Sequence, residues 1–248
     1  MKKLLLLSAL LIFACSSDDS SDTNDDNDNN NELLNCDGNP VPTIVYGTQE
    51  WTVENACHTT YRDGTPIPQV TDYTEWNYLT IGAWCYYEND PTKPRLYNWY
   101  AIMGIHDTDP NTPNKDFTPE GWHVPSHGEW TTLRNYLIIN GYNYDFTSIG
   151  NKISKSMASS SGWNGSSITG TPGNNQSLNN SSEFNAVPIG FRGSAGDYFQ
   201  ESTVTAFWSS TETNTLRAWG RSLEHDSNNL IDVEGIKVEG YSIRLVKD

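Results

Sequence analysis

The chain has 248 residues and a formal net charge of −16, and it contains nine Trp, thirteen Tyr and nineteen Gly. So acidic a surface repels nucleic acid and anionic lipid headgroups, and we therefore expect no nucleic-acid partner. Residues 33–248 contain 13 basic and 24 acidic side chains. This segment is long enough for one large domain or two small ones.

The first fifteen residues indicate export. Two lysines and an apolar run over residues 4–13 precede Ala14 and Cys15. The apolar run is too short to cross a bilayer, which needs about 20 residues, and the pattern is typical of a cleaved signal peptide. A cysteine directly after the small residue resembles a bacterial lipoprotein signal. This resemblance implies a signal peptide over residues 1–14 and acylation of Cys15; an ordinary secretory signal with an incidental cysteine is the alternative.

An acidic polar segment follows Cys15. Residues 16–31 consist only of Ser, Asp, Asn and one Thr. Without apolar side chains the segment cannot offset the entropy lost on ordering. We therefore predict a disordered acidic tether over residues 15–35 and a single domain over residues 36–248. In lipoproteins with this type of signal, acidic residues after the cysteine are linked to display at the cell surface. The resemblance thus implies a lipid-anchored protein of the bacterial outer membrane, exposed at the surface, although the inner leaflet stays open.

Three cysteines remain after lipidation: Cys36, Cys57 and Cys85. The exported compartment permits disulfides, and an odd number of cysteines allows at most one internal pair. Cys57 and Cys85 both lie among apolar and aromatic residues. We therefore predict a Cys57–Cys85 disulfide and leave Cys36, at the end of the tether, as the odd one.

Two segments have helical patterns. Ser126 and Glu129 form a capping box directly after Pro125, which predicts a helix over residues 126–140. Asp72 is a suitable cap for a second helix over residues 71–79. The apolar faces are formed by Trp130, Leu133 and Leu137 in the first helix, and by Trp76 and Leu79 in the second.

The rest of the chain favours short strands and long loops. Residues 42–46 and 50–53 predict a hairpin around Gly47, and further strands are expected over residues 83–87, 96–102, 206–210, 217–223 and 241–246. Residues 157–182 are mostly Ser, Gly, Asn and Thr, and a loop of this length is usually functional or mobile. The pattern predicts an α+β, loop-rich domain of short antiparallel strands with one or two helices.

Several motifs in a fixed order resemble one bacterial family. They are residues 62–68 (RDGTPIP), 84–90 (WCYYEND), 96–101 (LYNWYA), 119–130 (PEGWHVPSHGEW), 184–192 (FNAVPIGFR), 207–212 (FWSSTE) and 242–248 (SIRLVKD). Together they are similar to the Fibrobacter succinogenes major paralogous domain, over about residues 45–248. The resemblance implies an exported, often lipid-anchored module with a C-type-lectin-like fold, distantly similar to the formylglycine-generating-enzyme superfamily.

We expect structural roles for the motif residues Trp99, Trp122, His123, Pro125, Trp130, Trp208 and Arg244. A tryptophan between a glycine and a proline fills a corner of the core, and we expect His123 to bond to backbone. Four arginines lie among aromatic residues, so we expect them to stack on rings or to pair with Glu212 or Glu129. These arginines are Arg192, Arg217, Arg221 and Arg244.

The sequence contains only weak candidates for metal-binding motifs. His123 and His127 have the spacing of zinc ligands on a helix, but Pro125 places His123 outside the helix. Asp107, Asp109 and Asn111 have calcium-loop spacing, but Thr112 and Thr118 replace the glycine and the bidentate acid. We therefore favour a solvated loop and expect no cofactor, with calcium near these three residues as the alternative.

Three classes of function remain. The first is a non-catalytic surface module that binds glycan or protein, with the loop over residues 159–180 and the turn near Tyr198 and Phe199 as the contact surface. The second is a structural component of the envelope or of a larger surface assembly. The third, an enzyme, has the least support, because nothing selects Glu129, Glu183 or Glu212 as a catalytic pair.

Overall fold

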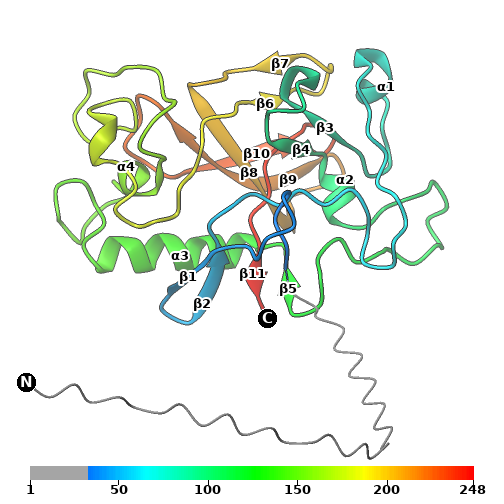
Figure 1. Ribbon diagram of the computed structural model, residues 1–248, viewed down its shortest axis with the longest axis horizontal. Helices are drawn as coiled ribbons and strands as arrows, with labels where there is room; N and C mark the ends of the chain where they lie inside the picture. The colour runs from blue at the N-terminus through cyan, green and yellow to red at the C-terminus, as the bar shows by residue number, and fades with distance from the viewer. Residues whose placement is uncertain (1–32) are drawn as a thin grey trace, which may run out of the picture. The chain divides into compact units, whose positions relative to one another are not determined.

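The computed structural model of the protein describes residues 33–248. These residues belong to one compact unit, an α+β arrangement of small antiparallel sheets connected by long loops (Figure 1). The predicted signal peptide over residues 1–14, the lipidation site Cys15 and the tether as far as residue 32 lie outside the described residues. Within the described part, no helix has the length and apolar character needed to span a bilayer.

The main helix, α3 (His127–Ile139), confirms the helix predicted over residues 126–140. The Ser126 hydroxyl accepts a hydrogen bond from the Glu129 backbone N–H, and the Glu129 carboxylate accepts one from the Ser126 N–H, so the predicted capping box is present. Trp130, Leu133 and Leu137 are buried. They lie on one face, as the helical repeat requires, and this face packs against the longest strands of the domain.

The other helices are short. Helix α1 (Tyr73–Asn77) lies within the segment predicted over residues 71–79, and the Asp72 carboxylate caps it by accepting from the Glu75 N–H at 2.8 Å. The remaining turns are α2 (Trp99–Ile102), α4 (Ser154–Met157), η1 (Tyr87–Asn89) and η2 (Gln176–Leu178). The strand predicted over residues 96–102 is wrong beyond Tyr97, because Asn98 accepts a hydrogen bond from the Ala101 N–H and starts α2.

The largest sheet has the strand order β1-β2-β11-β5. The predicted hairpin is present: β1 (Thr43–Tyr46) pairs antiparallel with β2 (Gln49–Thr52). The last strand, β11 (Val246–Lys247), lies between β2 and β5 (Trp122–His123). This sheet therefore joins three segments that are far apart in the sequence, in the lower part of the view in Figure 1.

A three-stranded sheet has the order β10-β9-β8 and contains β8 (Val204–Glu212), β9 (Arg217–Glu224) and β10 (Ile231–Ile236). Two hairpins complete the fold: β3 (Trp84–Tyr86) with β4 (Arg95–Tyr97), and β6 (Phe191–Arg192) with β7 (Tyr198–Phe199). Of the strand predicted over residues 241–246, only the end belongs to a regular strand; Tyr241 and Ser242 form isolated bridges.

The core is rich in indole rings and contains buried arginines. Seven of the nine tryptophans are buried, as are Arg192, Arg221 and Arg244. The predicted stacking is found for two of these: the Arg192 guanidinium lies 4.2 Å from the Trp76 ring and that of Arg244 lies 4.6 Å from the Phe184 ring.

The predicted pairing of the arginines with Glu212 or Glu129 is not found within residues 33–248. Arg221 instead forms an ion pair with Asp232 at 3.0 Å. Glu212 pairs with Lys237 at 2.6 Å, and Glu129 is engaged by a histidine. The sequence alone did not indicate these partners of Arg221, Glu212 and Glu129, because the tertiary structure brings them from other segments of the chain.

The predicted Cys57–Cys85 disulfide is wrong. Cys57 bonds to Cys36, with a Cα–Cα distance of 5.7 Å. Cys85 is a free, buried thiol that packs with Trp76 and Leu96. Its apolar surroundings thus reflect core packing, whereas Cys36 is brought to Cys57 because Leu33 packs in the same cluster as Ala56. Leu33 is buried, although it lies within residues 15–35, which we predicted as a disordered tether.

Candidate functional site

The predicted motif residues lie mainly in the interior. Trp99, Trp130 and Trp208 are buried, and each indole N–H donates to a backbone carbonyl oxygen. Pro125 is buried as well, and Trp122 on β5 is half-buried. Enclosed rings cannot stack on the face of a sugar, so Trp99, Trp130 and Trp208 have the placement of scaffold residues.

His123 lies between two carboxylates. Its Nε2 is 2.7 Å from Glu129 Oε1 and its Nδ1 is 2.7 Å from Asp248 Oδ1. The prediction that His123 bonds to backbone is therefore wrong, because the sequence does not show that β11 brings Asp248 beside β5. Burial opposes protonation, but the hydrogen bonds that the ring N–H groups donate to the two carboxylates outweigh it and raise the pKa of His123. With both ring nitrogens engaged, His123 joins the chain end to the start of α3.

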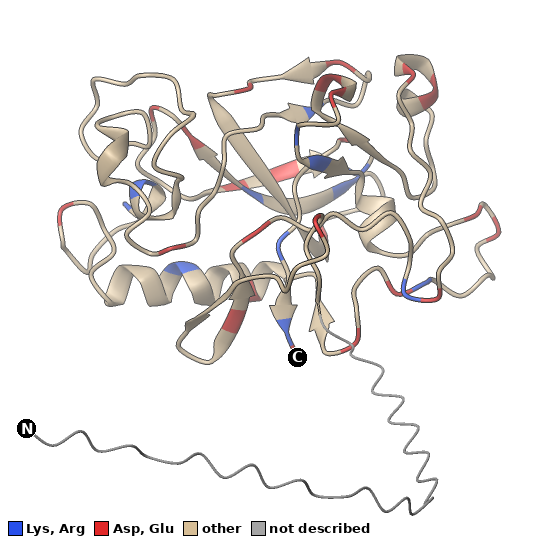
Figure 2. Ribbon diagram, in the orientation of Figure 1, with Lys and Arg blue, Asp and Glu red and all other residues tan. Residues whose placement is uncertain are grey.

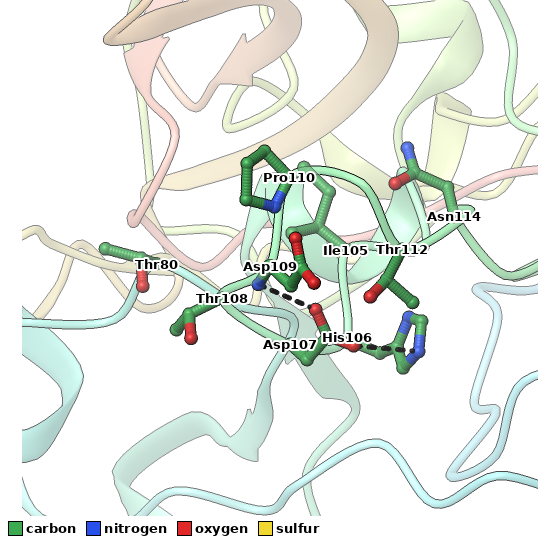
Figure 3. Close-up of a pocket in the computed structure, with 9 residues that line it drawn as sticks. All are labelled: Thr80, Ile105, His106, Asp107, Thr108, Asp109, Pro110, Thr112 and Asn114. Atoms are coloured by element: carbon green, nitrogen blue, oxygen red, sulfur yellow. Dashed lines mark hydrogen bonds and ion pairs between the residues drawn. The ribbon is translucent and has the colours of Figure 1, made fainter.

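The acidic loop with calcium-like spacing lines a hollow of about 520 Å³ (Figure 3). One Asp107 oxygen accepts the Asp109 N–H at 2.9 Å, and one Asp109 oxygen accepts the Asn111 N–H at 2.9 Å. The His106 ring lies 3.5 Å from the other Asp107 oxygen. These carboxylates thus shape their own loop. No group of three or more His, Cys, Asp or Glu residues able to hold a metal is found in residues 33–248, and calcium near Asp107, Asp109 and Asn111 stays a prediction.

A second hollow, which we call the disulfide pocket, lies beside the Cys36–Cys57 bridge. Its volume of about 500 Å³ is within the range of ligand sites. Six segments form its walls: the segment before β1, the chain after β2, the end of β3, the turn into β4, the loop before β6 and the segment before β11. The lining residues are Cys36, Asp37, Val53, Glu54, Asn55, Tyr86, Pro91, Thr92, Lys93, Pro94, Arg95, Asn185, Val187 and Arg244.

Two guanidinium groups characterise the disulfide pocket. Arg244 is 1% exposed and donates from Nη1 to the Thr52 carbonyl at 2.9 Å and from Nη2 to the Asn185 carbonyl at 3.1 Å. Arg95 donates from Nη1 to the Cys57 carbonyl and from Nη2 to the Tyr86 hydroxyl. Burial lowers the pKa of Arg244 to about 9, which leaves the group charged at neutral pH.

Some of the buried side-chain polar atoms without a hydrogen-bond partner in residues 33–248 belong to residues that line this pocket. The side-chain amide of Asn55 and the Nε atoms of Arg95 and Arg244 have no hydrogen-bond partner among the described residues. A buried polar group without a partner typically destabilises a fold by about 1–3 kcal/mol, and native structures contain few of them. Three such residues lining one hollow favour a site that receives a polar ligand.

Sequence reasoning identified Arg244 but missed Asn55, Tyr86 and Arg95. The available signal was the hairpin register: if residues 84–97 form two strands, Tyr86 is opposite Arg95, as the structure has it. Asn55 and Glu54 had no local signal, because their place in the pocket depends on β2 packing near the end of the chain.

The predicted contact loops have mixed surfaces. In the loop over residues 159–180, Trp163 is buried and its indole N–H donates to the Ser159 hydroxyl at 3.1 Å. Ile168 and Leu178 are exposed. At the β6–β7 hairpin, Phe199 is 44% exposed. Their role as a contact surface stays a prediction.

A family model matches most of the chain. The model of the Fibrobacter succinogenes major domain matches residues 44–247 of this chain. The chain therefore belongs to this family, as its motifs predicted. Comparison with curated proteins and with solved structures gave no match.

Proposed function

We propose that the protein is a lipid-anchored, non-catalytic module of the bacterial cell surface that binds a carbohydrate in the disulfide pocket. The observation that carries this proposal is the set of unpartnered polar side chains at Asn55, Arg95 and Arg244 around one hollow. Carbohydrates present many hydroxyl groups, which satisfy such donors and acceptors, and the ring of Tyr86 together with Pro91 and Pro94 adds surface for the apolar face of a sugar.

The proposal includes a C-type-lectin-like fold. Its support is the antiparallel pairing of β2 with β11, which brings together the two ends of the region that the family model matches. Long loops between the strands then present the pocket while the sheets hold its walls.

A non-catalytic role is supported by the partners of the candidate carboxylates. Glu129 is engaged by Ser126 and His123, and Glu212 by Lys237. Each thus has a structural use within the described residues.

The binding site is tested with the full mature protein on a glycan array. Thr92→Trp fills the disulfide pocket from its exposed rim, and Thr80→Trp, at the rim of the acidic-loop hollow, is the matched control. We expect Thr92→Trp to abolish glycan binding and Thr80→Trp to preserve it. The opposite pattern would move the site to the acidic loop, and an empty array together with an empty pull-down from biomass extract would overturn the proposal.

The anchor is tested by metabolic labelling with radioactive palmitate. We expect label on the wild-type protein and none on Cys15→Ala, because acylation at this sulfur is what holds the chain at the membrane. Protease treatment of intact cells should then remove the anchored domain. Resistance to protease in intact but not in lysed cells would indicate the inner leaflet.

The alternative is a structural component of the envelope. Mild crosslinking followed by purification distinguishes the two: a fixed set of partners with unchanged yield for Thr92→Trp would favour the structural role.

A further inference from the structure

We infer that the disulfide pocket is selective for a carbohydrate that carries a carboxylate, such as a hexuronate, with Arg95 as the residue that recognises the acid. This inference rests on the proposed function and adds the chemical class of the ligand.

The disulfide pocket contains two arginines without an ion-pair partner. Acidic residues outnumber basic ones in residues 33–248, where they spread over the loops (Figure 2). Most basic side chains there have a carboxylate partner, but neither Arg95 nor Arg244 has one among the described residues, and both line this pocket. Arg244 is buried and Arg95 is half-buried, and a cation that is removed from water without an ion-pair partner favours an anionic ligand, because the surrounding dielectric is low.

Arg95 has more N–H donors than its protein partners use. A guanidinium group has five N–H donors in a planar fork that matches a carboxylate. Arg95 uses two of its nitrogens within the protein, Nη1 toward the Cys57 carbonyl and Nη2 toward the Tyr86 hydroxyl, while Nε has no partner among residues 33–248. The Asn55 amide adds further unpaired donors beside it. Together these groups suit the two oxygens of a carboxylate.

The pocket also has acidic side chains, which can accept hydrogen bonds from hydroxyl groups of a ligand. Glu54 and Asp37 also line the pocket. A ligand that was only an anion would be repelled by these two side chains, whereas a sugar acid offers hydroxyl donors to them and its carboxylate to Arg95. The combination of arginine and acid in one hollow therefore favours an acidic sugar over a simple anion.

The Arg95 side chain is held in place by its neighbours before any ligand binds. The Arg95 guanidinium lies 4.9 Å from the Trp84 ring and 5.6 Å from the Tyr86 ring. Its contact with the Cys57 carbonyl ties it to the disulfide-bonded residue itself. A side chain held in this way loses little entropy when it binds a carboxylate, which favours affinity.

The test measures binding of oligogalacturonate and of its methyl ester to the full mature protein by calorimetry. The two probes have the same sugar backbone and differ in the charge of the carboxyl group. We expect the acid to bind about tenfold tighter or more than the ester. Arg95→Gln should remove this preference, and Arg217→Gln, on an exposed arginine of β9, should keep it.

A second variant guards against loss by misfolding. Glu54→Gln removes a negative charge from the pocket but keeps a side-chain oxygen that can accept a hydroxyl hydrogen bond, so we expect the ratio of acid to ester affinity to rise several-fold above that of the wild type. Loss of folding cannot produce such a gain. Melting curves of Arg95→Gln complete the control.

Three outcomes would overturn the inference. Equal binding of acid and ester, unaffected by Glu54→Gln, would leave a carbohydrate module without acid selectivity. Binding of peptides through a free C-terminal carboxylate, with the same dependence on Arg95, would assign the pocket to a protein ligand. Absence of binding to both sugars and to a neutral glycan array would contradict the proposed function itself.

Discussion

Buried arginines show how single residues organise this fold. Arg192 is fully buried and donates to the carbonyl oxygens of Val70, Thr71, Asp72 and Gly196. These bonds compensate for taking the charge out of water. They also attach the segment that caps α1 to the β6–β7 hairpin, so one side chain fixes the position of two elements.

Replacement of Arg192 by Lys tests this role. Lysine keeps the charge but lacks the planar fork, so most of the four carbonyl oxygens lose their donor. We expect the free energy of unfolding to fall by about 2–4 kcal/mol in urea titration. Arg217→Lys is the matched control, since Arg217 is exposed and donates to one carbonyl; an equal loss in both variants would contradict the role of Arg192.

The protonation of His123 gives a pH dependence. Because Glu129 and Asp248 raise its pKa in the folded state, this contact stabilises the fold most below the unfolded pKa of about 6.5. The contribution is lost as the pH rises through the folded pKa. We expect the free energy difference between wild type and His123→Asn to be larger at about pH 5.5 than at about pH 9.

His58 titrates in the opposite sense, which is why the wild type is compared with the His123→Asn variant. Burial lowers the pKa of His58 to about 4, so this residue favours unfolding as the pH falls. It is present in both proteins and cancels in the difference. A difference that is independent of pH would show that His123 acts through packing alone.

At the scale of elements, helix α3 is the part that local sequence specifies most completely. Its cap, its apolar face and its end at Asn140 all lie within residues 126–140, so the pattern predicted them. The strand error at residues 96–102 has the opposite origin. Aromatic residues favour strands, but the side-chain oxygen of Asn98 accepts hydrogen bonds from the Ala83 and Ala101 N–H groups, and a helical turn begins there.

The capping box has a measurable contribution. Ser126→Ala removes the acceptor for the Glu129 N–H at the start of α3. We expect a loss of about 1 kcal/mol in the free energy of unfolding, measured by chemical denaturation. Ser181→Ala, at an exposed serine outside any helix, should change stability little, and comparable losses in the two variants would argue against a specific role of the cap.

At the scale of the whole molecule, the Cys36–Cys57 bridge connects the first described residues to the domain. It closes a loop of 21 residues in sequence separation. In the chain-entropy model such a loop contributes about 3 kcal/mol. We expect reduction of the wild type to lower its free energy of unfolding by this amount.

The matched control for reduction is the double variant Cys36→Ser and Cys57→Ser. Reductant should leave its stability unchanged, because its remaining described cysteine, Cys85, is a free thiol. A non-reduced proteolytic digest should contain the Cys36 peptide joined to the Cys57 peptide. A digest that joins Cys57 to Cys85 instead would contradict the structure.

The sequence by itself determined the family, the α+β class, the first hairpin and helix α3, and it predicts an exported, acylated chain. These features depend on neighbouring residues or on motif order, which a linear pattern records. Only the tertiary structure decided which cysteine pairs with Cys57, which acids hold His123 and which side chains surround Arg95. Each of these depends on contacts between distant segments, above all on β11 lying between β2 and β5. Secondary-structure propensity depends on neighbouring residues and cannot predict such contacts, because the free energy that selects them comes from packing the whole domain.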